Sequence, residues 1–173
     1  MSDAKNILDT GRLSLRRFAL SDAPFIVELL NDPAFIRFIA DRGVRTEDDA
    51  RNYLQTGSLA SYAQFGFGLF LVSLRTDSTP IGMCGLLKRP ELDDADIGFA
   101  FLPAYCAKGY AYEIAAALLS VARGHFGVER VVAIVNHDNA ASIRLLQRLG
   151  FAFEKKHAVP WHAEPLLLFG RAT

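Results

Sequence analysis

The residues of this chain best placed to do chemistry form a short turn, residues 106–111, with Gly109 at its centre. An Ala-rich helical run follows directly, over residues 112–123. The first backbone N–H groups of a helix have no partner inside it, so a loop that opens a helix can bind an anion. A glycine also suits a tight turn for purely structural reasons. The turn alone therefore predicts a phosphate-bearing ligand without identifying it.

Two common nucleotide sites are excluded by the same stretch. A P-loop needs a second glycine and an ending in Gly-Lys-Ser or Gly-Lys-Thr, and residues 106–111 have neither. A dinucleotide-binding turn needs several spaced glycines and an acidic residue at the end of the next strand, and these are also missing.

A second candidate for chemistry is the helix predicted over residues 139–149. It begins with Asn139 and Ser142 and stops at Gly150 and Phe151. Gly150 suits the left-handed position after a helix, and Phe151 can pack back on the last turn. Each residue also has a plain structural explanation, because Asn139 can cap a helix and Ser142 can occupy its first turn. The apolar face of this helix consists of Ile143, Leu145, Leu146 and Leu149.

The hydrophobic pattern supplies the elements that would position these residues. The predicted strands cover residues 13–18, 66–74, 81–87, 96–102, 131–135, 151–156 and 165–170. The predicted helices cover residues 22–30, 33–39, 47–54, 112–123 and 139–149. Ser21 is expected to cap the first of them, and Thr46 to open a capping box for the third. Hairpins come first and helical crossovers later, so the fold class is a single α+β (mixed α/β) domain.

Length and composition limit the class of protein. A chain of 173 residues suits one domain, here residues 11–173 behind a flexible polar lead at residues 1–10. The 19 basic and 19 acidic residues balance, which gives no general attraction to nucleic acid or to anionic membranes. The longest apolar run is about ten residues, roughly half a membrane span. Cys84 and Cys106 lack both metal-ligand and disulfide spacing, so a cytoplasmic protein is expected.

Taken together and in order, these motifs resemble a known family. Residues 99–103 (Phe-Ala-Phe-Leu-Pro), 107–111 (Ala-Lys-Gly-Tyr-Ala) and 139–151 (Asn-x-Ala-Ser to Leu-Gly-Phe) are similar to the acetyl-CoA core of the GNAT N-acetyltransferase superfamily. Residues 11–16 and 21–23 resemble its branch of ribosomal-protein N-terminal acetyltransferases (RimJ/RimL-like). The resemblance spans about residues 11–171. It implies a twisted, mostly antiparallel sheet flanked by helices, with its fourth and fifth strands splayed apart.

The resemblance also implies which residues hold the co-substrate, acetyl-CoA. Strand backbone would pair with the pantetheine amides as a pseudo-strand. Loop amides would bind the pyrophosphate at the helix N-terminus, with the side chain of Lys108 as an added cation. Asn139 would reach the pantetheine arm, and Glu113 would serve as a partner of the helix dipole. No metal is implied. The strand residues are Phe99, Ala100 and Phe101, and the loop residues are Ala107, Lys108, Gly109, Tyr110 and Ala111.

The implied reaction is direct transfer of an acetyl group from the thioester to a primary amine. The amine must first lose a proton, and Asp96, which matches the acidic residue before Ile-Gly in this branch, is a candidate base. A strand-edge charge explains Asp96 equally well, and a chain of waters could remove the proton. Many family members place a Tyr seven residues after the helix Asn to protonate the sulfur, but this chain has Leu146 there. Ser142 is the remaining candidate acid, and the thiolate can also leave without one.

Several alternatives stay open at this point. The acceptor could be a protein N-terminus, a polyamine, an amino-sugar antibiotic or a small metabolite. The helices of residues 22–54 and the bridge of residues 157–164, which carries Trp161, are expected to select it. Acidic residues at 47–49 and 93–96 could attract any amine. A non-catalytic acyl-CoA-binding module is the second hypothesis, and a nucleotide-binding regulator is the third. A homodimer is neither indicated nor excluded.

Overall fold

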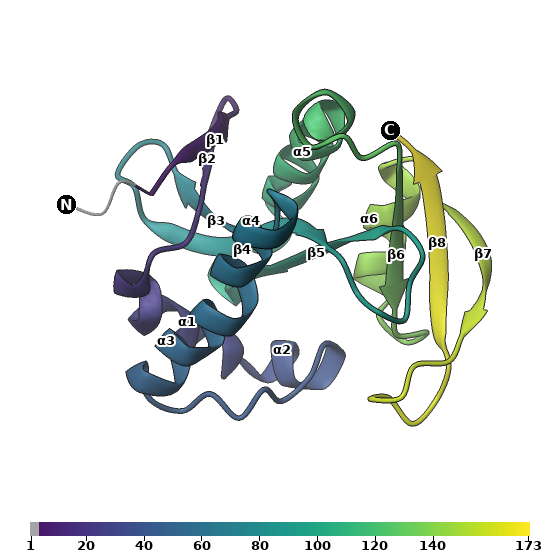
Figure 1. The fold of residues 1–173 in the computed structure, drawn as a ribbon, viewed down its shortest axis with the longest axis horizontal. Coiled ribbons are helices and arrows are strands. Elements are labelled where there is room, and N and C mark those ends of the chain that lie inside the picture. The colour runs from purple at the N-terminus through teal and green to yellow at the C-terminus, as the bar shows by residue number, and fades with distance from the viewer. Residues whose placement is uncertain (1–3) are drawn as a thin grey trace.

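The computed structural model describes residues 4–173, which form one eight-stranded sheet and six α-helices (Figure 1). The strands are β1 (Asn6–Asp9), β2 (Leu13–Arg16), β3 (Leu69–Leu74), β4 (Pro80–Leu87), β5 (Ala95–Phe101), β6 (Arg130–Val135), β7 (Ala152–His157) and β8 (Leu166–Ala172). The helices are α1 (Ala23–Leu30), α2 (Pro33–Phe38), α3 (Glu47–Leu54), α4 (Ala60–Phe65), α5 (Tyr110–Phe126) and α6 (Ala140–Arg148).

The sheet runs in the order β1-β2-β3-β4-β5-β6-β8-β7, and every neighbouring pair is antiparallel except β5 and β6. These two strands pair in parallel at Ala95 with Val131 and at Asp96 with Val132, and the ladder stops there. From Ile97 onward β5 has lost β6 as a neighbour. The sheet is therefore open in its middle, as the splayed strands of the sequence analysis predicted.

Helices cover both faces of the sheet, and each face has its own core. On one face α5 and α6 pack through residues such as Ile114 and Leu146 against the inner strands. On the other face α1, α2 and α3 pack through Ile26, Phe35 and Leu54. Figure 1 shows α2 below β5, between the other N-terminal helices and the loop that joins β7 to β8. Apolar residues alternating along the strands can serve both cores because successive side chains point to opposite faces.

The helix boundaries follow the predicted capping residues closely. The hydroxyl of Thr46 accepts a hydrogen bond from the N–H of Asp49, and the Asp49 carboxylate bonds back to the N–H of Thr46, which completes the predicted capping box of α3. Asp32 caps α2 through the N–H groups of Ala34 and Phe35. The prediction for Ser21 was wrong, because a short 3-10 turn at Leu20–Asp22 precedes α1 and no cap bond comes from that serine.

Two parts of the sheet and its connections differ from the sequence expectation. Asn6–Asp9 forms an edge strand, so the strand predicted as the first is the second. The strand predicted from residue 66 starts only at Leu69, because α3 continues through a π turn (Gln55–Leu59) into α4. Gly66 ends α4 in the left-handed conformation at φ 79° instead of entering the strand. No helix within residues 4–173 is both long and apolar enough to cross a membrane.

Candidate active site

The gap between β5 and β6 opens into a cavity of about 690 Å³. Its lining comes from both sides of the gap: the β4–β5 loop, β5, the loop from β5 to α5, the start of α5, the end of β6, α6, α2 with the residues that follow it, the β7–β8 loop and the start of β8. The cavity therefore crosses the whole thickness of the molecule at the one place where two neighbouring strands separate. Apart from Lys108, the turn of residues 106–111, the start of α6 and Asp96 all line this cavity.

The backbone of β5 presents unused hydrogen-bonding groups to this gap. Leu102 donates its N–H to the carbonyl of Ile81, on the β4 side. Neighbouring residues of a strand direct their backbone groups to opposite sides, so Phe99 and Phe101 direct theirs into the gap. Ala100, the third strand residue predicted to pair with pantetheine, directs its backbone toward β4. Its side chain instead faces the α1–α3 side of the sheet.

The loop before α5 has the geometry of an anion site. Ala107 and Gly109 both adopt left-handed conformations, with φ 58° and 80°. Alternation of left-handed and right-handed residues makes successive N–H groups converge. Within residues 4–173 no acceptor takes the N–H of Ala107, Lys108 or Gly109, and the first turn of α5 adds further free N–H groups. The left-handed alanine is a feature that the sequence did not reveal.

Lys108 contributes less than the sequence suggested. Its side chain does not line the cavity, and its ammonium group lies 5.8 Å from the ring centre of Tyr105. Its carbonyl accepts a hydrogen bond from the guanidinium of Arg12 at 3.1 Å. What Lys108 offers to the site is thus its backbone N–H. Tyr110 and Ala111, the other loop residues, do line the cavity.

The start of α6 forms the wall opposite the loop. The side-chain carbonyl of Asn139 accepts the N–H of Ser142 at 3.3 Å, so Asn139 is an N-cap. Its amide NH2 group remains as a donor beside the cavity. Ser142 and Leu146, one turn further on, both line the cavity, but Ser142 is half-buried and Leu146 is 1% exposed and packs in the core. A core leucine can neither give nor accept a proton.

Asp96 lies at the closed end of the gap, where β5 and β6 are still paired. Because Ala95 and Ile97 belong to the core under α5, the side chain of Asp96 points to the opposite face, the side of α1–α3. It lines the cavity although it is 2% exposed. Burial raises the pKa of Asp96 to about 6, even though the charge of Arg89 and its hydrogen bonds oppose this shift.

Arg89 holds this carboxylate in place. Its Nε lies 3.1 and 3.2 Å from the two carboxylate oxygens of Asp96. The guanidinium lies 5.5 Å from the ring centre of Trp161, in the β7–β8 loop. A buried carboxylate with a partly exposed partner and a pKa near neutrality is the combination that proton transfer requires. Trp161 and His162 both line the cavity, while His157 lies against the carbonyl of Glu91, outside it.

The acidic residues thought to attract an amine are placed elsewhere, except for Asp96. Glu47 and Asp48 pair with Arg51 on the surface of α3, and Asp49 is used by the capping box. None of these three lines the cavity, and neither do the acidic residues at positions 93 and 94. The lining includes four arginines that the sequence analysis missed, since an isolated arginine carries no pattern. They are Arg42, Arg89, Arg144 and Arg148.

Within residues 4–173, no group of three or more His, Cys, Asp or Glu side chains is arranged to hold a metal ion. The two cysteines are unpaired, with Cys84 buried in the core and Cys106 exposed at the cofactor loop.

Comparisons with known proteins agree with this geometry. The model of the acetyltransferase (GNAT) domain matches residues 12–152. The uncharacterized N-acetyltransferase YnaD of Bacillus subtilis (strain 168) is 29% identical over 147 residues, which cover 85% of this chain and 83% of YnaD. A solved GNAT-family acetyltransferase from Bacillus anthracis is 26% identical with a TM-score of 0.77, covering 98% of each chain.

The ribosomal L7/L12 N-terminal acetyltransferase RimL, solved in complex with coenzyme A, has the same fold. Its TM-score is 0.83 at 17% identity, over 97% of this chain and 98% of RimL. The fold and the site thus define an acetyltransferase of the GNAT type. Because the family model matches well over half of the sequence, the chain belongs to the GNAT acetyltransferase family.

Proposed function

We propose that this protein transfers the acetyl group of acetyl-CoA to a primary amine. The observation that carries the proposal is the opening between β5 and β6, with free loop N–H groups at its wide end and a buried carboxylate at its closed end. A long thioester with a phosphate-bearing tail fits this arrangement end to end. Membership of the GNAT family supports acetyl transfer as the reaction.

In this proposal the cofactor takes the place of the missing strand neighbour. The amides of the pantetheine arm pair with the backbone of Phe99 and Phe101, and the pyrophosphate binds the N–H groups of residues 107–111. The amide NH2 of Asn139 donates to the arm from the other wall. The thioester then lies near Asp96, at the point where the two strands converge.

The chemical step needs a base, a site for the oxyanion and a proton for sulfur. The carboxylate of Asp96 takes a proton from the ammonium of the acceptor, directly or through one water molecule. The freed nitrogen lone pair attacks the thioester carbonyl carbon, and backbone N–H groups of β5 stabilise the oxyanion. The attacking nitrogen then loses its second proton to solvent, the carbon–sulfur bond breaks, and the amide product and a coenzyme A thiolate separate. Asp96 returns its proton to solvent.

Ser142 is our candidate for protonating the departing sulfur. It lines the cavity at the start of α6, whereas the buried Leu146 cannot take this role. If Ser142 is the acid, Ser142→Ala lowers kcat by about tenfold or more and leaves acetyl-CoA affinity unchanged. An unchanged kcat would assign the proton to solvent. The same substitution keeps the helix cap, because the cap uses the backbone N–H of Ser142.

We also propose a RimJ/RimL-like acetyltransferase domain that works in the cytoplasm, and it includes residues 6–9, expected to be part of a flexible lead, because they form β1 of the sheet. The fold of RimL supports the branch, and two free cysteines fit a reducing compartment. The acceptor is then either a peptide N-terminus or a small amine.

One experiment tests the proposed function. The purified protein is incubated with acetyl-CoA and a panel of amines and peptides, thiol release is followed, and products are examined for the mass of one added acetyl group. Amine-dependent thiol release with an acetylated product is expected. Asp96→Asn is the matched control, because it keeps the shape of the site and removes the base. Binding of acetyl-CoA without turnover of any amine would contradict the proposal and indicate an acyl-CoA-binding module.

A further inference from the structure

An arginine without a partner within residues 4–173 lies on the wall of the cavity that α2 and the residues after it form. We call this wall the acceptor side. Arg42 follows α2, in the connection of residues 39–46 that leads to α3, and it lines the cavity. Within residues 4–173 its side chain takes part in no ion pair and no hydrogen bond. The positively charged residues next to it in sequence behave differently, since Arg45 is fully engaged. Arg42 is exposed, so water solvates its charge, and that charge is available to an anionic ligand that enters the cavity.

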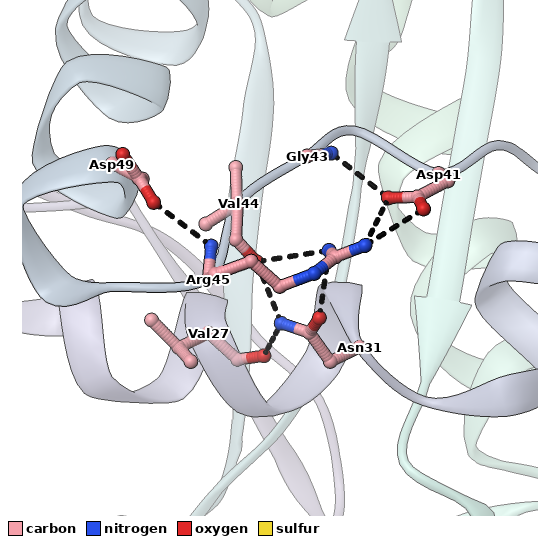
Figure 2. A network of polar contacts seen from close by, with 7 residues as sticks. All are labelled: Val27, Asn31, Asp41, Gly43, Val44, Arg45 and Asp49. Atoms are coloured by element: carbon pink, nitrogen blue, oxygen red, sulfur yellow. Dashed lines mark hydrogen bonds and ion pairs between the residues drawn. The ribbon is translucent and has the colours of Figure 1, made fainter.

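The connection that carries Arg42 is fixed from both sides (Figure 2). The guanidinium of Arg45 bonds both oxygens of Asp41, at 2.9 and 2.7 Å. The N–H of Gly43 donates to the same carboxylate at 2.9 Å, in a turn where Gly43 has φ 69°. The carboxylate of Asp41, the acidic group closest to Arg42 in the chain, is thereby occupied. It does not neutralise Arg42.

Helix α1 anchors the other end of this connection (Figure 2). The amide NH2 group of Asn31 donates to the carbonyls of Val27 and Val44, each at 2.7 Å, and its carbonyl accepts from Arg45 at 2.9 Å. Val44 is buried. These bonds restrain the backbone of residues 41–45 and so fix the point from which the exposed side chain of Arg42 extends. Pre-organised groups bind more tightly because less conformational entropy is lost.

A second guanidinium faces the same region. Burial raises the pKa of the Tyr53 hydroxyl, and the positive charges of Arg42 and Arg89 both oppose that shift. Both arginines also line the cavity. Arg89 gives its Nε to Asp96, and its terminal nitrogens have no partner within residues 4–173. The acceptor side thus has one neutralised arginine and one that is not.

The rest of this wall is apolar. Phe35, Phe38 and Ile39 extend from α2, and Trp161 closes the opposite side. Across the whole cavity the charged lining residues are four arginines against two aspartates, Asp32 and Asp96. Asp32 is occupied as the cap of α2. A polycationic acceptor would meet repulsion here, whereas an apolar molecule with one amine and one carboxylate would match each part of the wall.

We propose that Arg42 binds a carboxylate of the acceptor, and that the acceptor is a free amino acid with an apolar or aromatic side chain. This inference rests on the proposed acetyl transfer and adds its substrate class. The amine of such a molecule points toward Asp96 and the thioester, the carboxylate meets Arg42, and the side chain lies against Phe38 and Trp161. Transfer gives an N-acetylated amino acid and coenzyme A.

The test compares acceptors that differ only in the carboxylate. With acetyl-CoA, kcat/KM is measured by thiol release for L-phenylalanine, its primary amide and phenethylamine, across a range of pH. The amide has the less basic amine, so intrinsic reactivity at neutral pH favours it over the acid. Against that trend, L-phenylalanine is expected to exceed both analogues by about tenfold or more, since an ion pair with hydrogen bonds is lost in each.

Arg42→Gln then identifies the group responsible. It is expected to lower kcat/KM for L-phenylalanine by about tenfold, chiefly through KM, and to leave both analogues within about twofold. Arg37→Gln is the matched control, because Arg37 lies on α2, is exposed and does not line the cavity. Thermal stabilisation by coenzyme A shows that each variant is folded and binds its cofactor.

The outcomes separate this inference from the proposed function. Equal turnover of acid, amide and amine by the unaltered protein would overturn the role of Arg42 and leave acetyl transfer intact. So would an equal loss for all three acceptors in Arg42→Gln, or turnover of peptides or polyamines with none of amino acids. Absence of turnover for every amine would reject both. The comparison of acceptors on the unaltered protein decides the matter even if Arg42→Gln does not fold.

Discussion

The carboxylate of Glu113 is bound by Arg12, although the two residues are 101 positions apart in the chain. Arg12 donates its Nε at 2.7 Å and its backbone N–H at 3.0 Å, and the hydroxyl of Thr10 adds a third bond at 2.6 Å. Arg12 also donates to the carbonyl of Lys108 and lies 4.4 Å from the ring centre of Tyr110. The turn between β1 and β2 therefore supports the cofactor loop from outside. Glu113 is a structural partner of that turn as much as of the helix dipole.

Loosening this support is expected to weaken cofactor binding without changing the chemical step. Arg12→Met removes the side-chain bonds to Glu113 and Lys108 and keeps the backbone bond to Glu113 and an apolar contact with Tyr110. We expect acetyl-CoA affinity to fall by about three- to tenfold and kcat to change little, because ordering the loop then costs part of the binding energy. Calorimetric titration with coenzyme A measures the first, and saturating kinetics the second. The surface pair of Arg51 and Glu47 offers the control Arg51→Gln.

The pair of Glu113 and Arg12 also predicts how the stability of the protein changes at low pH. Burial alone would raise the pKa of Glu113, but hydrogen bonds from Thr10 and Arg12 outweigh it and lower the pKa below its usual value. A lowered pKa in the folded state stabilises the protein above the unfolded value, and this stability is lost as the pH falls through the folded value. Thermal unfolding of Glu113→Gln and the unaltered protein should therefore differ at pH 7 and converge below about pH 4. A constant difference across that range would contradict this.

Gly109 and Gly127 make a matched pair for testing the loop. Both are left-handed, at φ 80° and 70°, and they flank the two ends of α5. Alanine at either site is expected to cost about 1 kcal/mol of stability, because a Cβ disfavours this conformation. Only Gly109→Ala should weaken coenzyme A binding, by about tenfold, since its N–H lies in the loop and its Cβ would approach Arg12 at 3.4 Å. Equal affinity in both variants would refute the assignment of the loop.

Asp96 predicts the acidic limb of the pH–rate profile. Burial raises its pKa to about 6. As a base it is active above this value, so kcat/KM should rise through an ionisation near pH 6 that Asp96→Asn abolishes, with a loss of about a hundredfold. A carboxyl group with a raised pKa stabilises the folded state below its ordinary value of 3.8, and that contribution disappears as the pH rises past 6. The charged groups that shift the pKa of Asp96 are Arg89 and Glu91, so Glu91→Gln is the control that should shift the limb only slightly.

Cys106 provides a chemical reporter of the same loop. It is exposed beside the cavity, whereas Cys84 is fully buried, and burial raises the pKa of the Cys84 thiol to about 12. Iodoacetamide is therefore expected to modify Cys106 alone, at a rate that saturating acetyl-CoA lowers several-fold. Peptide mass analysis locates the label, and Cys106→Ser should remove it. An unchanged rate in the presence of acetyl-CoA would mean that the cofactor does not cover the loop.

Most of the fold could be predicted because its signals are local. Strands such as β6 are continuous apolar runs, and α3 begins with a capping box that works through four neighbouring residues. The strand β1 and the helix α4 were missed for the opposite reason. Residues 6–9 are too few and too polar to show a period, and the chain from residue 55 to 65 continues α3 through a π turn that no sequence pattern marks.

The residues of the candidate site also fall into those with a local sequence signal and those without one. The loop and the start of α6 were predicted because glycine and capping residues leave recognisable spacings. The pairing of Arg89 with Asp96 and the exposure of Arg42 to the cavity depend on tertiary contacts between segments. From sequence alone, an arginine is predicted to be a solvated charge on the surface. Only the three-dimensional arrangement shows which ones have a partner and which do not.

The separation of β5 from β6 also has a mechanical side. Five strands lie on one side of it and three on the other, and within residues 4–173 only two pairs of residues join them in the sheet ladder. The core beneath α5 and α6 also holds the two blocks of strands together, so the sheet ladder is interrupted here but the packing is not. A bound thioester would bridge the gap between β5 and β6. The backbone amides of Phe99 and Phe101 would then exchange with deuterium far more slowly than they do without acetyl-CoA. The sheet would then be continuous only in the complex with acetyl-CoA.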